Sequence, residues 1–549
     1  MPPALAQRFG PWLGLIALCL ALYLPGFATL PAIDRDEARF AQATKQMLET
    51  GDFVRIRYQD EARNKKPIGI YWAQAASAAL FGGAMAPIWS YRLPSLIALT
   101  LAVLLLYETG CRLFERRTAF LAASLLAACL LAVVEAHLAK TDAGLLMTTV
   151  ATQGALGLIY LRGRGALPTG WLLPLGFWVG LGLGVLIKGP VLPLISGLTI
   201  LALGLADRSL AWLTRLRPVV GLAIVATITG PWLLAISRAT QGTFLTDAVA
   251  NDLLPKLISG QESHGAPPGY YLLLLAVGFF PASLQLGPAL RDAWRRRLLP
   301  AERFCLAWLL PAWIVFELVP TKLPHYVLPL YPALALLTAR FVIAAAAAPR
   351  GKPSRWGRAG LVVWAAVALG LVGAAAAVPQ LVDHRLDAVA LAPLLAVLVG
   401  AGAALVLGWR GRTLGSTVAA IAASSILFAT VLGTVLPRAQ GLWLSERAAE
   451  MMLAYRPSAA SPVAAAGYAE PSLVFRLGTA TALTGGAGAA DFLATHEAAL
   501  ALVAADQDAA FRAQAAALGL TVQALDQRTG YNYSRGRWTT LALYRRAQS

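Results

Sequence analysis

The stretch LGSTVAAIAASSILFATVLGTVLP, residues 414–437, contains no charged side chain. An α-helix needs about 20 mainly apolar residues to cross a bilayer, so this stretch predicts a transmembrane helix. Only 13% of the 549 residues are charged, whereas about 25% is usual for a soluble protein. The sequence therefore predicts an all-α polytopic membrane protein with about 13 transmembrane helices, near 11–31, 91–112, 117–136, 141–162, 171–187, 189–206, 217–237, 269–290, 302–319, 324–345, 358–378, 386–409 and 414–437.

The net charge of +18 would fit a nucleic-acid partner, but the distribution of the charge argues against one. If the N-terminus is cytoplasmic, the six short inner loops hold 19 Lys and Arg residues and only four Asp and Glu residues. This excess is the positive-inside bias of a membrane protein. The charge therefore indicates orientation, and we expect no nucleic-acid partner. The inner loops are 112–117, 162–164, 207–217, 291–303, 350–358 and 410–412.

The apolar segments divide the chain into two predicted domains. Residues 1–437 form a transmembrane domain with outer loops at 32–90 and 238–268. Residues 438–549 have soluble-type composition, and an odd number of spans from a cytoplasmic start places them in the periplasm. Alternation of apolar and helical runs predicts a small α/β domain there, with strands at 462–467, 498–504, 520–525 and 537–546 and a helix at 508–518. Within the first outer loop, residues 37–48 predict a helix lying on a surface.

Ionisable residues gather at the predicted outer ends of the spans. Carboxylates occur at Asp34, Asp36 and Glu37, and Asp142 begins a span. A carboxylate at such a position can act as a base or bind a cation. The basic and aromatic members are Arg39, Lys65, Lys66, Lys140, Lys188, His264, Lys322, His325 and Tyr326.

Each of these groups alone can also be explained without a functional site. An acidic run is often a solvated loop, paired lysines often anchor lipid headgroups, and a lone histidine at a span end often only packs. Together, however, they put acids, bases and histidines on one side of the membrane, while the inner face holds mostly arginine. A site for an anionic, membrane-held substrate explains this asymmetry. The sequence contains no P-loop or dinucleotide fingerprint, which fits a lipid-phosphate donor.

Three stretches resemble a known family. The first outer loop, with Asp34-Arg35-Asp36-Glu37-Ala38-Arg39 and Lys66-Pro67, is similar to that of bacterial aminoarabinose transferases, as are Leu186–Pro190 and Thr321–Pro329. That family belongs to the membrane-embedded GT-C superfamily, which includes protein O-mannosyltransferases. The resemblance covers about residues 10–340 and implies a GT-C fold.

The resemblance also implies roles for individual residues. Asp36 and Asp142 resemble the family's catalytic acids, and Glu37 lies beside the first of them. Arg39, Lys66, Lys188 and Lys322 are expected to bind the donor phosphate, and Lys65, His264, His325 and Tyr326 to contact substrate. The family's usual Glu-Lys-Pro triplet is Lys65-Lys66-Pro67 here. An acid that could help to hold a divalent metal is thus replaced by a base. The sequence therefore assigns no cofactor, and a divalent metal stays an open alternative.

The expected function is transfer of a sugar from a polyprenyl-phosphate donor, such as undecaprenyl phosphate, with inversion. The expected acceptor is lipid A or another envelope glycan. Asp36 either deprotonates an acceptor hydroxyl or positions cationic groups. The competing classes are a transporter or flippase of lipid-linked sugars and a ligase of surface glycans. We expect a monomer in contact with membrane lipids in the bacterial inner membrane, with the active site and C-terminus periplasmic.

Overall fold

The computed structural model describes residues 3–33, 35–163, 170–248, 250, 255, 265–348, 351–458 and 460–547. Within these ranges, seven helical segments are long and apolar enough to cross a membrane. They are α4 (Ile88–Leu113), α7 (Asp142–Gly163), α10 (Pro218–Ala239), η5 with α16 (Pro324–Ala347), α17 (Arg355–Asp383), α18 with α19 (Ala388–Trp409) and α20 through α21 (Thr413–Arg438). The prediction of a mostly helical, multi-pass membrane protein is confirmed.

Two further segments are bent pairs, which raises the number of candidate spans in the described residues to nine. One joins α5 (Arg116–Ala127) to α6 (Leu130–Ala136) at 61°, and the other joins α13 (Tyr270–Gly278) to the segment Ala282–Arg295, which holds η4 and α14, at 115°. Shorter apolar helices occur at Phe9–Tyr23 in α1 (Pro3–Tyr23), in α8 (Leu172–Lys188) and in α9 (Val191–Asp207), while α15 spans Pro300–Leu318. By length and composition the count is seven to nine, so the expected number of thirteen stays a prediction.

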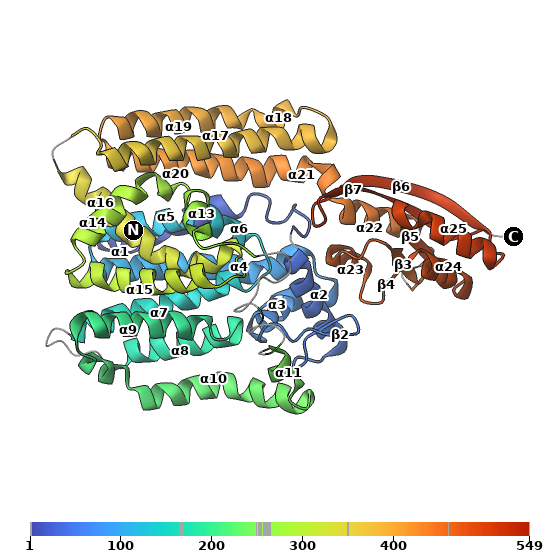
Figure 1. Ribbon diagram of the computed structural model, residues 1–549, viewed down its shortest axis with the longest axis horizontal. Helices are drawn as coiled ribbons and strands as arrows, with labels where there is room; N and C mark the ends of the chain where they lie inside the picture. The colour runs from blue at the N-terminus through green and yellow to red at the C-terminus, as the bar shows by residue number, and fades with distance from the viewer. Residues whose placement is uncertain are drawn as a thin grey trace.

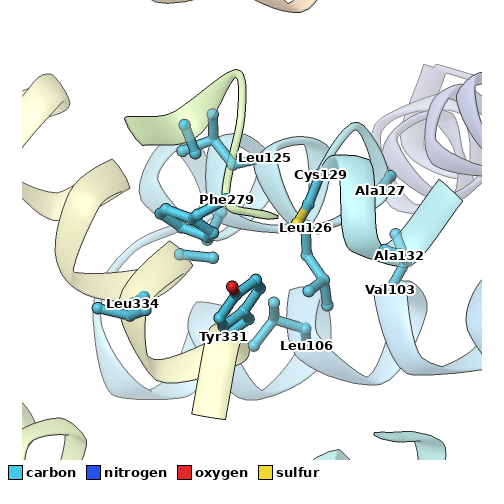
Figure 2. Packing of buried hydrophobic residues seen from close by; sticks show 14 of the residues in the cluster. Val103, Leu106, Leu125, Leu126, Ala127, Cys129, Ala132, Phe279, Tyr331 and Leu334 are labelled. Carbon is cyan, nitrogen blue, oxygen red and sulfur yellow. The ribbon is translucent and has the colours of Figure 1, made fainter. Parts of the chain in front are cut away.

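The two bends support each other through backbone contacts. In membranes, backbone groups freed by a helix break must find partners within the protein. Here the amide of Leu130 donates to the carbonyl of Phe280 at 2.8 Å, and the Cys129 thiol donates to the carbonyl of Gly278 at 2.9 Å. Around this point α4, α5, α6 and α16 pack their buried side chains together, with the rings of Phe279 and Tyr331 in edge contact at 5.2 Å (Figure 2). The bend places α6 beside α7 and η5.

Burial separates central from peripheral helices. The apolar window of α7 is 83% buried, whereas that of α10 is 22% buried. In Figure 1, α10 forms one outer edge of the bundle, and α17 with α19 forms the opposite edge. We infer that α7 is enclosed by other helices, while α10, α17 and α19 face lipid.

The outer-loop region contains α2 (Arg35–Thr50), the short strands β1 (Arg57–Tyr58) and β2 (Glu61–Ala62), and α3 (Gly69–Leu80). A helix over 37–48 was expected to lie on a surface, and this expectation is wrong. Ten residues of α2 are buried, because α3 covers one side and the C-terminal part covers another. The Lys45 ammonium, for example, donates to the carbonyl of Phe475 at 3.1 Å. Further short helices are η1 (Gly83–Met85), η2 (Ala211–Leu216) and α11 (Thr243–Thr246).

The C-terminal part forms a five-stranded sheet with the order β4-β3-β5-β7-β6. Strand β3 is parallel to β4 and β5, and β7 is antiparallel to β5 and β6. The strands are β3 (Val463–Ala466), β4 (Ala482–Thr484), β5 (Leu500–Ala504), β6 (Val522–Asn532) and β7 (Arg537–Arg546); the helices are η7 (Gln440–Leu442), α22 (Leu444–Tyr455), α23 (Pro471–Leu477), α24 (Gly486–Thr495), η8 (Ala505–Gln507) and α25 (Asp508–Ala517). Four strands overlap expected ones, but β6 continues to Asn532, beyond the expected end at 525, and β4 was missed. Whether this part is a separate domain stays a prediction.

A buried ion pair joins α2 to the helix bundle. The Arg92 guanidinium on α4 donates to both carboxylate oxygens of Glu37, at 2.7 and 2.9 Å, and both side chains are fully buried. Arg92 also donates to the carbonyls of Phe27, Leu30 and Pro31, at 3.1, 2.7 and 2.6 Å. Glu37 in turn accepts from the amides of Ile33 and Ala139, at 2.8 and 3.0 Å. Arg92 and Glu37 thereby connect the loop after α1, α2, α4 and the segment before α7.

We expect Arg92→Met to lower the free energy of unfolding by about 3–5 kcal/mol, because it leaves the Glu37 carboxylate buried without its counter-charge. Thermal and denaturant unfolding of the purified protein in detergent, followed by tryptophan fluorescence, measures this. The control is Arg112→Met on the same helix, where the ion pair with Glu108 is largely exposed at 3.4 Å. That change should cost less than about 1 kcal/mol. Equal effects of the two substitutions would contradict the structural role of Arg92.

Candidate active site

The ends of two neighbouring helices bring an acid and a base together. Asp142 is the first residue of α7, and Lys188 is the last residue of α8. A helix N-terminus favours a carboxylate and a helix C-terminus favours a cation, so each helix dipole stabilises the charge that it carries. The two side chains form a buried ion pair. Close packing allows this approach, since a Cβ added at Gly144 would lie 3.2 Å from the Ile187 side chain.

His325 and Tyr326 reach the same place from η5 (Pro324–Leu330). The imidazole Nε2 of His325 lies 3.8 Å from an Asp142 carboxylate oxygen. The Lys188 ammonium lies 5.3 Å from the centre of the Tyr326 ring, within range of a cation–π contact. Four of the predicted residues, Asp142, Lys188, His325 and Tyr326, are therefore brought together.

Glu135 on α6 is a fifth member of this cluster that sequence reasoning missed. Its carboxylate lies 3.3 Å from the Lys140 ammonium and 3.8 Å from Nδ1 of His325. The imidazole of His325 thus lies between the carboxylates of Glu135 and Asp142. Lys140 is buried, so its ammonium is held inside the protein beside Glu135. A single acid within the apolar run 117–136 was the available signal, because buried ionisable residues in membrane segments are usually functional.

Asp36 and Arg39 lie at the start of α2. Asp36 interacts electrostatically with Lys140 and His325 of this cluster. Their side chains form an ion pair at 3.4 Å and are partly exposed. Burial on its own would raise the pKa of the Asp36 carboxyl, but Arg63, Lys140 and Arg39 together lower that pKa below its ordinary value. The carboxylate of Asp36 is therefore ionised at neutral pH, next to several cations.

The segment with Lys65 and Lys66 lies beside the end of α8. A Cβ added at Gly69 would lie 2.9 Å from the carbonyl oxygen of Leu186, so the start of α3 and the end of α8 are in direct backbone contact. Lys66 is half-buried, Lys65 is exposed, and Arg63 stacks over the Phe40 ring of α2 at 5.0 Å. These contacts bring the basic residues of the first outer loop toward Lys188.

Two predicted site residues, Glu37 and Lys322, take other positions. Glu37 is fully buried against Arg92, which makes it a positioning residue for α2 and argues against a catalytic role. Lys322 is buried, and its ammonium donates to the carbonyls of Ala266 and Val319 at 3.0 and 2.6 Å. These hydrogen bonds therefore go to backbone instead of to the cluster. His264 lies outside the described residues.

The cluster contains three side chains that could ligate a divalent metal. Glu135, Asp142 and His325 each offer a ligand atom, and these atoms lie within 4.8 Å of one another. However, Lys140 and Lys188 already neutralise the two carboxylates, so a divalent cation would have to displace both ammonium groups. The charge balance of these residues does not fit a resident divalent ion.

We expect the purified protein to retain well under one equivalent of zinc after incubation with zinc and desalting, as measured by inductively coupled plasma mass spectrometry. The variant Lys140→Met/Lys188→Met should retain more, because both carboxylates lose their counter-charges. One equivalent in the unmodified protein, lost on His325→Ala, would show that the cluster does hold a metal.

Comparisons with known proteins agree with this arrangement. A family model described as dolichyl-phosphate-mannose-protein mannosyltransferase matches residues 65–234. Proteins named undecaprenyl phosphate-alpha-4-amino-4-deoxy-L-arabinose arabinosyl transferase, from Pectobacterium carotovorum and Pseudomonas paraeruginosa, are 29% identical over 320 residues and 32% identical over 309 residues. The matches cover 58% and 55% of this chain, and 56% and 54% of the relatives. The chain thus spans a little over half the length of the curated relatives that it matches.

Solved structures extend the likeness to the whole fold. The crystal structure of ArnT from Cupriavidus metallidurans bound to undecaprenyl phosphate has a TM-score of 0.76 at 21% identity, and the match covers 97% of this chain and 98% of that one. An oligosaccharyltransferase from Archaeoglobus fulgidus has a TM-score of 0.52 at 12% identity, with 91% and 69% covered. The expected resemblance to aminoarabinose transferases is confirmed, and the chain has their fold. Its described residues hold seven to nine candidate membrane spans.

Proposed function

We propose that the chain is a glycosyltransferase that moves a sugar from undecaprenyl phosphate to lipid A or another envelope glycan. The observation that carries this proposal is the cluster of carboxylates and cations where α6, α7, α8 and η5 meet, within electrostatic range of Asp36 on α2. Cations beside the membrane surface suit a lipid phosphate, and carboxylates beside them suit an acceptor. The names of the relatives, and the undecaprenyl phosphate bound in the ArnT crystal structure, support the same donor.

The cations would act on the leaving group. In the reaction the bond between the anomeric carbon and the phosphate oxygen breaks, and its electron pair remains on the phosphate. Lys188, Arg39 and Lys66 would stabilise that growing negative charge, which is usually the largest catalytic contribution. Lys188 is held in place by Asp142, so Asp142 would act by positioning it. Lys322 joins this group only if its ammonium leaves the two backbone carbonyls.

The acceptor oxygen would attack the anomeric carbon from the opposite side, in one step with inversion. An acceptor hydroxyl would pass its proton to the Asp36 carboxylate. An acceptor phosphate, already ionised, needs no base, and Asp36 would then orient Arg39 and its neighbours. Both roles require the negative charge of Asp36. Lys65, exposed in the loop before α3, would favour an acceptor or sugar that carries an anionic group.

The position of the charges favours a transferase over a transporter. Transporters of charged substrates bind near the membrane midplane, often at breaks within helices. Here Asp142 begins α7 and Lys188 ends α8, so the cluster lies at helix ends. Figure 1 shows α2 and α3 at the same end of the bundle as the C-terminal sheet. A site at one membrane surface suits transfer between two lipids in one leaflet.

We expect Asp36→Asn to lower the transfer rate by about 10²–10⁴-fold, because it removes the charge with little change in volume. The assay uses the protein in liposomes with undecaprenyl phosphate-linked aminoarabinose and lipid A, and mass spectrometry detects the modified lipid A. The control is Asp60→Asn, an exposed acid in the same outer loop, which should leave the rate within two-fold of its original value. Near-normal turnover by Asp36→Asn would remove Asp36 from the mechanism.

The site and the C-terminal part are proposed to face the periplasm, since 19 basic residues and four acidic residues fall on the opposite loops. With Cys111→Ala as the background, we expect Glu497→Cys to react with a membrane-impermeant maleimide in spheroplasts. Arg412→Cys, in an inner loop, should react only after the membrane is broken. The reverse pattern would place the cluster in the cytoplasm, where a periplasmic acceptor cannot reach it.

A further inference from the structure

A second group of basic residues lies at the end of the bundle opposite the cluster. Helix α7 begins at the cluster and α8 ends there, so the end of α7 and the start of α8 lie at the opposite end. The connector between α9 and α10, residues 208–217, meets them, since the Arg215 guanidinium donates to the carbonyl of Arg162 in the last turn of α7 at 2.9 Å. Figure 1 shows the start of α10 at the end of the bundle away from the C-terminal sheet. This basic connector is therefore separate from the cluster.

Arg217, the last residue of the basic connector, is fixed where α8, η2 and α10 meet. The indole N–H of Trp178 on α8 donates to the carbonyl of Leu216 at 2.7 Å. Gly221 on α10 lies against the ring of Trp178 and leaves no room for a Cβ atom. The φ angle of Arg217 is 53°, in the left-handed region, and it turns the chain from η2 into α10. These contacts hold the backbone of Arg217 at the start of α10.

The side chain of Arg217 is oriented by an aromatic ring but lacks an acceptor. Its guanidinium carbon lies 3.2 Å from the centre of the Trp171 ring, and arginine stacks on aromatic faces in this way. The Nη1 atom of Arg217 is buried, and no described residue accepts a hydrogen bond from it. Buried donors in folded proteins nearly always have an acceptor. The guanidinium is therefore positioned for an acceptor that the chain itself does not provide.

The acid next to the basic connector is already engaged. Asp207 accepts from the Tyr160 hydroxyl at 2.7 Å, and it forms a buried ion pair with Arg303. Arg208 and Arg217 form no ion pair with the described acids. A ligand with a net negative charge fits this balance. A zwitterion fits less well, because its ammonium group needs a carboxylate of its own.

Exposed tryptophans place the basic connector at the membrane surface. Four tryptophans of the described residues are more than half exposed, and each lies in or beside a loop predicted to be cytoplasmic. Tryptophan is enriched at membrane–water interfaces, where its ring lies at the level of the lipid headgroups. The four are Trp171 at the start of α8, Trp294 near the end of α14, Trp356 in the first turn of α17 and Trp409 at the end of α19.

Helix α10 offers a surface for an acyl chain directly next to Arg217. Its apolar window is only 22% buried, and Val219 and Leu222 on its first turns are exposed. A lipid whose acyl chain lies along this face has its headgroup at the start of α10. Arg217 and the Trp171 ring lie at that level.

We infer that Arg217 and Trp171 bind the phosphate of an anionic phospholipid, such as phosphatidylglycerol, in the cytoplasmic leaflet. The Nη1 atom of Arg217 donates to a phosphate oxygen, and the exposed Arg208 adds a second positive charge nearby. The choice of leaflet rests on the orientation proposed above. The binding itself is independent of the transfer reaction, because it occurs at the other end of the bundle.

The test titrates the whole purified protein in detergent with phosphatidylglycerol or phosphatidylethanolamine and counts bound lipids by native mass spectrometry. Arg217→Gln removes the charge, and Trp171→Ala removes an exposed ring that the fold does not need. The matched control is Arg297→Gln, in another of the loops predicted to be cytoplasmic. Its guanidinium also lies over an exposed ring, that of Trp294 at 5.2 Å, but its Nη1 atom already donates to a carbonyl at 2.9 Å.

The first phosphatidylglycerol should bind the unmodified protein about ten-fold more tightly than phosphatidylethanolamine does, because only it leaves no ammonium unpaired. Arg217→Gln should remove this preference, and Trp171→Ala should weaken it. Arg297→Gln should leave it within about two-fold, because its guanidinium has a partner already. Equal losses in Arg217→Gln and Arg297→Gln would show attraction by the whole surface and overturn the site.

Two further outcomes decide the proposal. Unchanged binding of phosphatidylglycerol by folded Arg217→Gln would overturn the site. If Arg217→Gln does not fold, unchanged binding by Trp171→Ala would overturn it instead. Loss of the lipid preference in Arg217→Gln, in a protein that transfers no sugar, would support the site while the proposed function fails.

Discussion

The ion pair between Arg92 and Glu37 is the constraint on which the geometry of the site depends. Taking two charges out of water is costly, and the cost is offset only where every donor and acceptor is satisfied. Here the guanidinium has both carboxylate oxygens and three carbonyls as partners, and the carboxylate also accepts two backbone amides. These hydrogen bonds therefore fix the position and orientation of the first turn of α2. Asp36 precedes Glu37, so the same hydrogen bonds hold it where it interacts electrostatically with Lys140 and His325.

A second constraint comes from where helices begin and end. Asp142 starts α7 and Lys188 ends α8, so backbone dipoles and the ion pair act in the same direction. The bend between α5 and α6 adds Glu135, and η5 inserts His325 between the two carboxylates. Fixed charges of this kind need no rearrangement when charge develops during a reaction, which is the basis of electrostatic catalysis.

Much of the fold and part of the site could be predicted from the sequence. Long apolar runs indicate membrane helices. Asp142, Lys188, His325 and Tyr326 could be identified as site candidates because they lie at the ends of these runs. The sequence could not show which face of α2 is buried. Neighbouring helical residues point about 100° apart, so Glu37 turns into the bundle although Asp36 beside it does not. The burial of α2 depends on residues more than 400 positions away, such as Phe475, which no local pattern reveals. Glu135 was hidden within an apolar run.

The proposed function makes one structural claim above the others: the lipid phosphate binds at the end of α8, between Lys188 and the first turn of α2. A cryo-electron microscopy structure of the protein with undecaprenyl phosphate tests this claim most directly. The proposed function predicts phosphate density within hydrogen-bonding reach of the Lys188 ammonium, with Arg39 or Lys66 as a second partner. Phosphate density held instead at the opposite end of the bundle, among the arginines between 291 and 303, would contradict it.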